Sequence, residues 1–326
     1  MPVQKRPDLL RRSWVACLVL GAVLWASAAV AQPVGLGTTQ AGATGQLAAA
    51  IAKVVSEKAG LQMRTQPMAG AAQYIPLVNA GELEFGIANI VETAYAYEGK
   101  VIVEGRPNPQ LRLVADLMPF LAGLLVQKDS PVRDVKDLKG QPVPSGFSGN
   151  PLGRVIMDGY LATDGITMAD TKQIPVPGFP RMFDAFKSGQ TVTTIAALGS
   201  GIVQEFDATM GGVRYLSFPN TPASTTALRK FMPQASFMDV KPEPGLAGIP
   251  GSTTLIGYDY VLFAGAQVKN ETVEKVAAAL FDNPGELKAT GPLWRDFEPK
   301  RMATDLGLPY HPGALAVYAK KGLKVP

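Results

Sequence analysis

The hydrophobic positions of this chain alternate, along most of its length, between the two-residue period of strands and the 3.6-residue period of helices. Period-two or continuously apolar runs predict strands at 61–66, 84–88, 111–115, 123–127, 191–197, 213–218 and 258–263. Runs with helical spacing predict helices at 46–58, 74–80, 89–97, 154–163, 181–187 and 271–281, with a last one ending near residue 320. Alternating strands and helices indicate α/β layers. Residues 219–257 are rich in Pro, Gly and Thr and predict no clear element.

A short strand beginning at Pro33 and another at 141–145 are also predicted. Three loops of small residues, at 37–45, 67–73 and 145–153, each follow a predicted strand and lead into a predicted helix. The start of a helix leaves backbone N–H groups free at the positive end of the helix dipole, which suits a carboxylate or phosphate. In open α/β sheets, ligands bind where such loops leave the strands. Three loops can meet at one ligand only if two lobes face each other, so the pattern predicts a small anionic solute held between lobes.

The candidate ligand-binding residues of these loops are polar or small. Plain turn chemistry is the alternative for each, because Gly, Ser and Asn are also the residues that turns use. The candidates are Thr38, Thr39 and Gln40 in the first loop, Gly70 in the second, and Ser145, Ser148 and Asn150 in the third.

Two arginines open predicted helices, where a positive charge opposes the dipole. A ligand carboxylate beside Arg154 or Arg181 would account for this placement, and exposure to solvent is the alternative. Tyr95 either reaches the cleft or packs against its own helix. The helical spacing of Phe179, Phe183 and Phe186 favours a core position over ligand stacking.

Residues 1–31 have the pattern of a secretory signal peptide. Four basic residues precede an apolar run at 15–30, which is shorter than the roughly 20 residues of a membrane-spanning helix. Ala29-Val30-Ala31 fits a cleavage site. We therefore expect a periplasmic mature chain, from residue 32 onward, that is not embedded in a membrane.

Charge and composition exclude several classes of function. The chain has 31 Lys and Arg against 27 Asp and Glu, and without residues 1–31 these become 27 and 26. A nearly neutral chain gives no reason to expect a nucleic-acid partner. Cys17, the only cysteine, lies within the expected signal peptide, so the mature chain can form no disulfide, thiolate metal site or Cys nucleophile. His311 is the only histidine and has no evident partners for a metal site. Nucleotide-binding motifs are absent. We expect no metal, no cofactor and no enzymatic activity.

Four blocks, in order, resemble the TAXI family of solute receptors that serve TRAP-type transporters. They are Gly35-Leu-Gly-Thr-Thr-Gln-Ala-Gly42; Met68-Ala-Gly-Ala-Ala-Gln-Tyr74 with Gly81-Glu-Leu-Glu-Phe-Gly-Ile87; Val135-Lys-Asp-Leu-Lys-Gly140; and Pro309-Tyr-His-Pro-Gly-Ala314. Asn89 stands where the family often has Gln, which adds it to the candidates. Ala41-Gly42 and Val192 depart from the family's double glycine and acid, so the resemblance does not identify the solute.

The resemblance implies a two-lobed fold of the type II periplasmic-binding-protein kind, with a cleft between the lobes. We expect lobe one at about 32–125 plus 225–326 and lobe two at about 126–224. The expected function is capture of a small anionic organic solute, an amino acid or an organic or dicarboxylic acid, and its delivery to a TRAP-type permease. A secreted enzyme on a similar fold and a ligand-binding subunit for a sensor are the alternatives.

Overall fold

A computed structural model describes Met1 and residues 32–40 and 42–324. The signal peptide predicted at 1–31 lies, apart from Met1, outside these residues. Residues 33–326 form one compact unit. Its strands are β1 (Gln32–Thr39), β2 (Leu61–Met68), β3 (Phe85–Asn89), β4 (Leu111–Gln127), β5 (Pro142–Gly146), β6 (Lys172–Val176), β7 (Thr193–Ala197), β8 (Val213–Tyr215), β9 (Ser236–Val240) and β10 (Thr253–Gly265).

The α-helices lie between these strands and at the end of the chain. They are α2 (Ala43–Lys58), α3 (Ala71–Ala80), α4 (Ile90–Glu98), α5 (Pro151–Ala162), α6 (Phe179–Lys187), α7 (Gly201–Thr209), α8 (Pro222–Arg229), α9 (Asn270–Asp282), α10 (Pro284–Lys288) and α11 (Pro312–Lys320). The predicted α/β class is confirmed.

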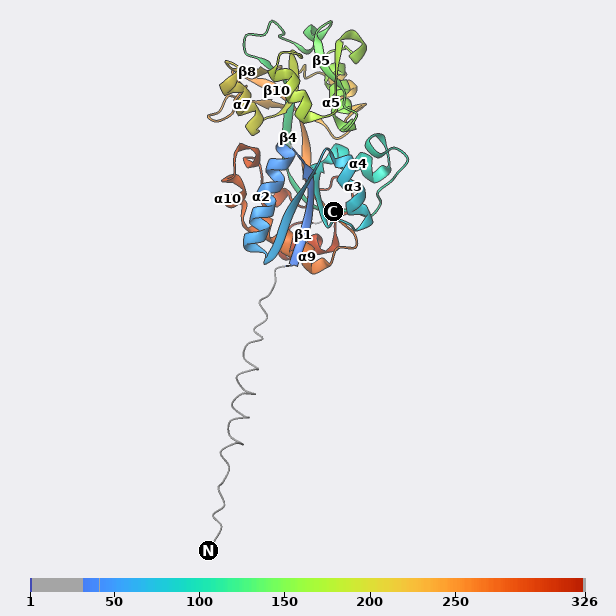
Figure 1. Ribbon diagram of the computed structural model, residues 1–326, viewed down its shortest axis with the longest axis vertical. Helices are drawn as coiled ribbons and strands as arrows, with labels where there is room; N and C mark the ends of the chain where they lie inside the picture. Colours follow the sequence, from blue (N-terminus) through green and yellow to red (C-terminus); the bar gives the residue numbers. More distant parts are fainter. Residues whose placement is uncertain (2–31, 41, 325–326) are drawn as a thin grey trace. The chain divides into compact units, whose positions relative to one another are not determined.

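One sheet connects the two lobes through a pair of long strands. Its order is β2-β1-β3-β10-β4-β7, with β9 also on β10 and β8 also on β4. β1 and β3 are parallel, whereas β10 is antiparallel to both β3 and β4. Figure 1 shows β4 and β10 passing from the group of elements around β1, α2 and α3 to the group around β5, α5 and α7.

The prediction of two separate strands at 111–115 and 123–127 was wrong, because β4 is continuous over 17 residues. Asp116 and Pro119 interrupt the apolar pattern, yet both lie in the ladder with β10, opposite Val261 and Asp259. Residues 219–257, which predicted no element, contain α8, β9 and the start of β10. β9 pairs with Thr253–Gly257, the end of β10 that lies beside Leu121 and Ala122 of β4.

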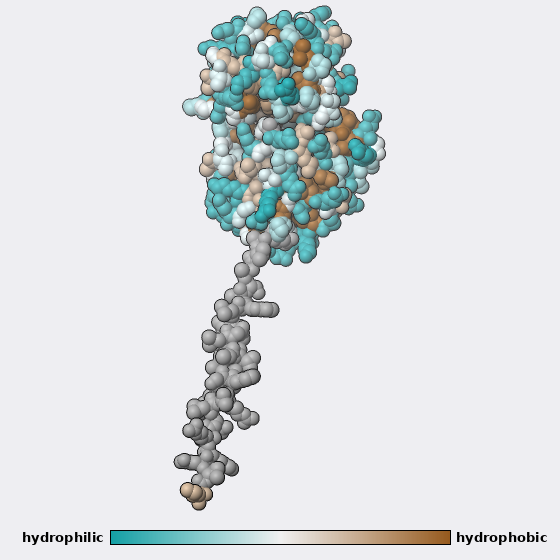
Figure 2. Space-filling view, viewed as in Figure 1, coloured by the Kyte–Doolittle hydropathy of each residue, from teal (hydrophilic) through white to brown (hydrophobic). Residues whose placement is uncertain are grey.

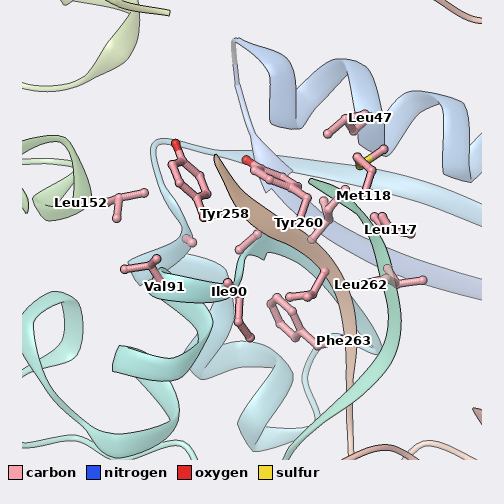
Figure 3. Packing of buried hydrophobic residues seen from close by; sticks show 14 of the residues in the cluster. Leu47, Ile90, Val91, Leu117, Met118, Leu152, Tyr258, Tyr260, Leu262 and Phe263 are labelled. Carbon is pink, nitrogen blue, oxygen red and sulfur yellow. The ribbon is translucent and has the colours of Figure 1, made fainter. Parts of the chain in front are cut away.

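The core lies on both faces of this sheet. Helix α2 buries Leu47, Ile51 and Val54 against it, and Figure 3 shows Leu47, Met118 and Phe263 packed around β10. Gly86 of β3 cannot carry a side chain, since a Cβ atom there would lie 2.4 Å from the Phe263 ring. The face in Figure 2 is mainly hydrophilic, with apolar residues in small separate areas.

Candidate functional site

A cavity lies where the two lobes meet, with an empty volume of about 580 Å³ that includes space open to solvent. Its described lining residues come from β1, α2 and α4 on one side, α5, α6 and β7 on the other, and β4 and β10 between them. They are Thr39, Gly42, Ala43, Thr44, Asn89, Glu92, Phe120, Ala122, Asn150, Leu152, Ile156, Phe179, Phe183, Ile195, Ala196, Ala197, Tyr258 and Tyr260.

The first turn of α2 forms part of the cavity wall. Its N-cap, Gly42, has a φ of 84° and supplies no side-chain cap, and the first turn holds no acidic residue. Among the described residues no side chain is seen to cap the N–H groups of this turn, and the dipole favours an anion. Thr44 shares a hydrogen bond with the Tyr260 hydroxyl. Thr38, which is buried, donates to the Thr44 carbonyl and so fixes the loop.

The beginning of α5 forms part of the opposite wall. Asn150 is its N-cap but gives no side-chain cap, and Pro151 follows it. The Asn150 residue is only 3% exposed, and no hydrogen bond to its side-chain amide occurs within the described part of the chain. This amide is therefore available to a bound solute. Gly70 lies beside it: a Cβ atom at Gly70 would be 3.2 Å from Asn150 Cγ.

Glu92 of α4 is the one residue with an ionisable carboxyl or cationic side chain among the described lining residues. It is 5% exposed. Asn89 caps α4 by accepting a hydrogen bond from the Glu92 N–H at 2.9 Å and donates a long one, 3.4 Å, to Glu92 Oε2. Burial raises the pKa of the Glu92 carboxyl to about 8. The empty cavity therefore holds Glu92 mainly in its neutral form at pH 7.

Aromatic rings cover much of the remaining wall. Phe120 packs against Tyr260 and Tyr258 with ring centroids 4.4 and 5.6 Å apart, and Figure 3 shows both tyrosines projecting from β10. Phe179 and Phe183 of α6 stack at 6.3 Å. Both line the cavity as well as packing against the core, so the core position expected from their spacing is only part of their role.

Three of the sequence candidates, Thr39, Asn89 and Asn150, meet in this cavity. Gly70 is next to the Asn150 side chain, and Thr38 holds the first loop through its hydrogen bond to the Thr44 carbonyl. Gln40 and Ser148 are exposed. Ser145 is buried and lines a different hollow, together with Arg154.

Arg154, Arg181 and Tyr95 do not line the cavity. Arg154 is exposed, and its Nε lies 3.6 Å from Asp158 Oδ2. Arg181 is also exposed, and its Nη1 lies 3.1 Å from Asp184 Oδ2. An acid one helical turn further on thus compensates each arginine, which the sequence reading overlooked. The Tyr95 hydroxyl donates to the Phe231 carbonyl at 2.7 Å. Tyr95 therefore ties α4 to the loop after α8.

Sequence reasoning missed Glu92, Phe120, Tyr258 and Tyr260. Tyr258 and Tyr260 were visible as alternate positions of a predicted strand, which places them on one face. Glu92 stands three residues after Asn89, the spacing of a helix-capping pair. Because a capping role is enough to explain a Glu at this position, the sequence did not indicate that Glu92 lines the cavity.

The sequence profile of the NMT1-like family matches residues 36–322. The chain belongs to the NMT1-like family. No helix in the described part of this NMT1-like chain is long and apolar enough to cross a membrane.

Solved structures share the fold at low sequence identity. "Structure of a periplasmic transporter" has 15% identity and a TM-score of 0.56, over 91% of this chain and 94% of the other. An R. palustris protein with adipate has 20% identity and a TM-score of 0.53, over 82% and 88%. A binding protein component of an ABC phosphonate transporter from Pseudomonas aeruginosa has 12% identity and a TM-score of 0.53, over 82% and 80%. The NMT1-like chain has the two-lobed fold of periplasmic binding proteins.

Proposed function

We propose that this protein is an extracytoplasmic receptor that captures a small organic solute bearing a carboxylate and delivers it to a membrane permease. One observation carries the proposal: the uncapped beginnings of α2 and α5 meet at one cavity from opposite lobes. A carboxylate between them would receive N–H groups from one side and the Asn150 amide from the other. Binding there would hold the lobes together, which is how a two-lobed receptor reports that it is loaded.

The solute class expected from the sequence, an amino acid or an organic or dicarboxylic acid, agrees with this arrangement. The R. palustris protein was solved with adipate, and the P. aeruginosa protein is a binding protein component of a phosphonate transporter; adipate and phosphonates are both anions. We propose a TRAP-type permease as the partner, on the basis of the four motif blocks that resemble TAXI receptors. Uptake of the solute by cells that carry this chain with a TRAP-type permease, but not with the permease alone, would test the partner.

The lining residues also favour a receptor over an enzyme. No Ser, Cys, His or Lys is among those described, so nucleophilic mechanisms that use these side chains have no residue here.

We propose that the second lobe includes β9, because β9 pairs with the part of β10 that lies beside the β7 and β8 half of β4.

Thermal unfolding of the purified protein against organic acids and amino acids tests the receptor. A solute at a hundred times its dissociation constant adds about 2.7 kcal/mol, which at this size raises Tm by about 5–10 °C. Ala197→Trp would fill the cavity and remove the shift, whereas Ala49→Trp on the exposed face of α2 would keep it. The proposal fails if no solute shifts Tm and mass spectrometry of the denatured protein finds no copurified molecule.

A further inference from the structure

In the part of the chain that the structure describes, no cation pairs with Glu92. Among the described residues its carboxyl receives a single hydrogen bond, the long one from Asn89, and no Lys or Arg lines the cavity. A buried carboxyl group with so few partners is unfavourable in the empty protein. Because Glu92 lies in the wall of a cavity, a bound solute can supply the missing hydrogen bonds or positive charge.

The rings beside Glu92 indicate the kind of group that is missing. Phe120, Tyr258 and Tyr260 line the same cavity, and the faces of aromatic rings attract cations and repel anions. A neutral carboxyl could instead donate a hydrogen bond to a second carboxylate on the solute. That carboxylate would be buried among ring faces without a cation, so the surroundings favour a protonated amine.

We propose that Glu92 determines specificity by pairing with an ammonium group of the solute, so that this receptor selects amino acids over carboxylic acids of the same shape. The inference rests on the proposed receptor function. The solute carboxylate binds at the beginnings of α2 and α5, and the ammonium group forms an ion pair with Glu92. An apolar segment between these two groups packs on Phe120 and Tyr258.

Proton release should accompany binding. The groups that face Glu92 are Asn89 of its own helix, Tyr74 of α3, and Tyr258 and Tyr260 of β10. Burial raises the pKa of all three tyrosines well above the neutral range, so they stay neutral and Glu92 alone titrates near pH 8. An ammonium requires the carboxylate form. Affinity should therefore rise up to about tenfold per pH unit between pH 6 and 7.5 and level off above about pH 8.

Isothermal titration with matched solutes tests the proposal on the purified protein, unfolded and refolded to remove copurified molecules. The probes are 6-aminohexanoate, adipate and hexanoate, and phenylalanine against 3-phenylpropionate. In at least one set the amine should bind at least tenfold tighter than its partners. Glu92→Gln should reduce that ratio to near one, and Glu92→Asp should restore part of it. Glu98→Gln, an exposed position on the same helix, should leave the ratio unchanged.

The outcomes separate this inference from the receptor function. Equal or tighter binding of adipate, hexanoate or 3-phenylpropionate, or an affinity that falls as pH rises, would overturn the role of Glu92 while the receptor stands. An unchanged ratio in Glu92→Gln would do the same. No binding of any probe, together with no thermal shift by any other solute, would remove both proposals.

Discussion

The fold surrounds two of its buried carboxyl groups, Asp116 and Glu92, in different ways. Asp116 of β4 is fully buried, and Arg301, at the end of the short 3-10 helix Pro299–Arg301, reaches its Oδ2 at 3.0 Å and Asp259 Oδ1 at 2.8 Å. Glu92 is 5% exposed, and no cation pairs with it among the residues that the structure describes. Asp116 is part of the scaffold that joins β4 to β10, whereas Glu92 borders a cavity. The comparison indicates that Arg301 compensates the carboxyl group that belongs to the scaffold. For the carboxyl group in the cavity wall, our proposal assigns the compensating cation to the solute.

Removing the cation from the structural group should have the largest effect. Arg301→Met would leave Asp116 and Asp259 close together without compensation and should lower the free energy of unfolding by about 2–4 kcal/mol at pH 8. This estimate is below that for a fully buried pair because the Arg301 side chain is 36% exposed. Denaturant unfolding measures the loss, which should shrink at pH 5. Lys288→Met, in an exposed pair with Glu298, is the control, and a loss no larger than that of the control would contradict the comparison.

Removing the charge from the cavity group should have the opposite sign. Glu92→Gln keeps the shape and the contact with Asn89 but cannot ionise, so it should raise the free energy of unfolding of the empty protein by about 1–3 kcal/mol at pH 8. The same variant should lose preference for amines. A destabilised Glu92→Gln would mean that Glu92 is structural, like Asp116.

The pH dependence of stability should reveal both groups. Burial raises the pKa of Asp116 to about 7, with the nearby Asp259 adding to the effect and Arg301 opposing it, and the pKa of Glu92 to about 8. The folded protein therefore holds protons that the unfolded chain has already lost, so stability falls as pH rises towards 8. Between pH 6.5 and 8.5 the Tm of the empty protein should fall by about 2–6 °C.

His311 opposes this trend at lower pH. Burial lowers the pKa of its imidazole, so below about pH 6.5 the unfolded chain binds a proton that the folded chain does not. One imidazole reduces the effect of the two carboxyl groups but does not reverse it. Scanning calorimetry from pH 5 to 9 should therefore give a Tm that falls less steeply below about pH 6.5 than between pH 6.5 and 7. Glu92→Gln should flatten the alkaline side, and an unchanged profile in that variant would contradict the assignment.

The smallest effect should come from the arginine that the sequence singled out. Arg154→Ala breaks only an exposed pair with Asp158 and should change stability by less than about 0.5 kcal/mol. Solute affinity should stay within about twofold of the original value. A loss of affinity tenfold or more, measured by titration calorimetry, would return Arg154 to the binding site.

The sequence predicted the parts of the fold and site that depend on local pattern. Helix α2, the loop before it and the placement of Asn150 in the turn that leads into α5 follow from residue type and spacing, although α5 begins at Pro151, three residues earlier than predicted. The continuity of β4 did not, because Asp116 and Pro119 resemble a strand end until Arg301 and β10 are placed around them. Glu92 and Arg154 show the same limit: each stands in the first turn of a helix, and only the tertiary fold decides which one faces the cavity.

The ladder between β10 and β4 changes register between Tyr260 and Val261. A second shift lies between Leu262 and Phe263. Tyr258 and Tyr260 lie before both irregularities and line the cavity, and they also belong to the same buried core as Leu262 and Phe263. A substitution at 258 or 260 therefore changes the shape of the cavity and the packing of the fold together. New specificities on this strand should evolve through pairs of compensating changes, and a biosensor with a new target would need the neighbouring core residues varied along with these two positions.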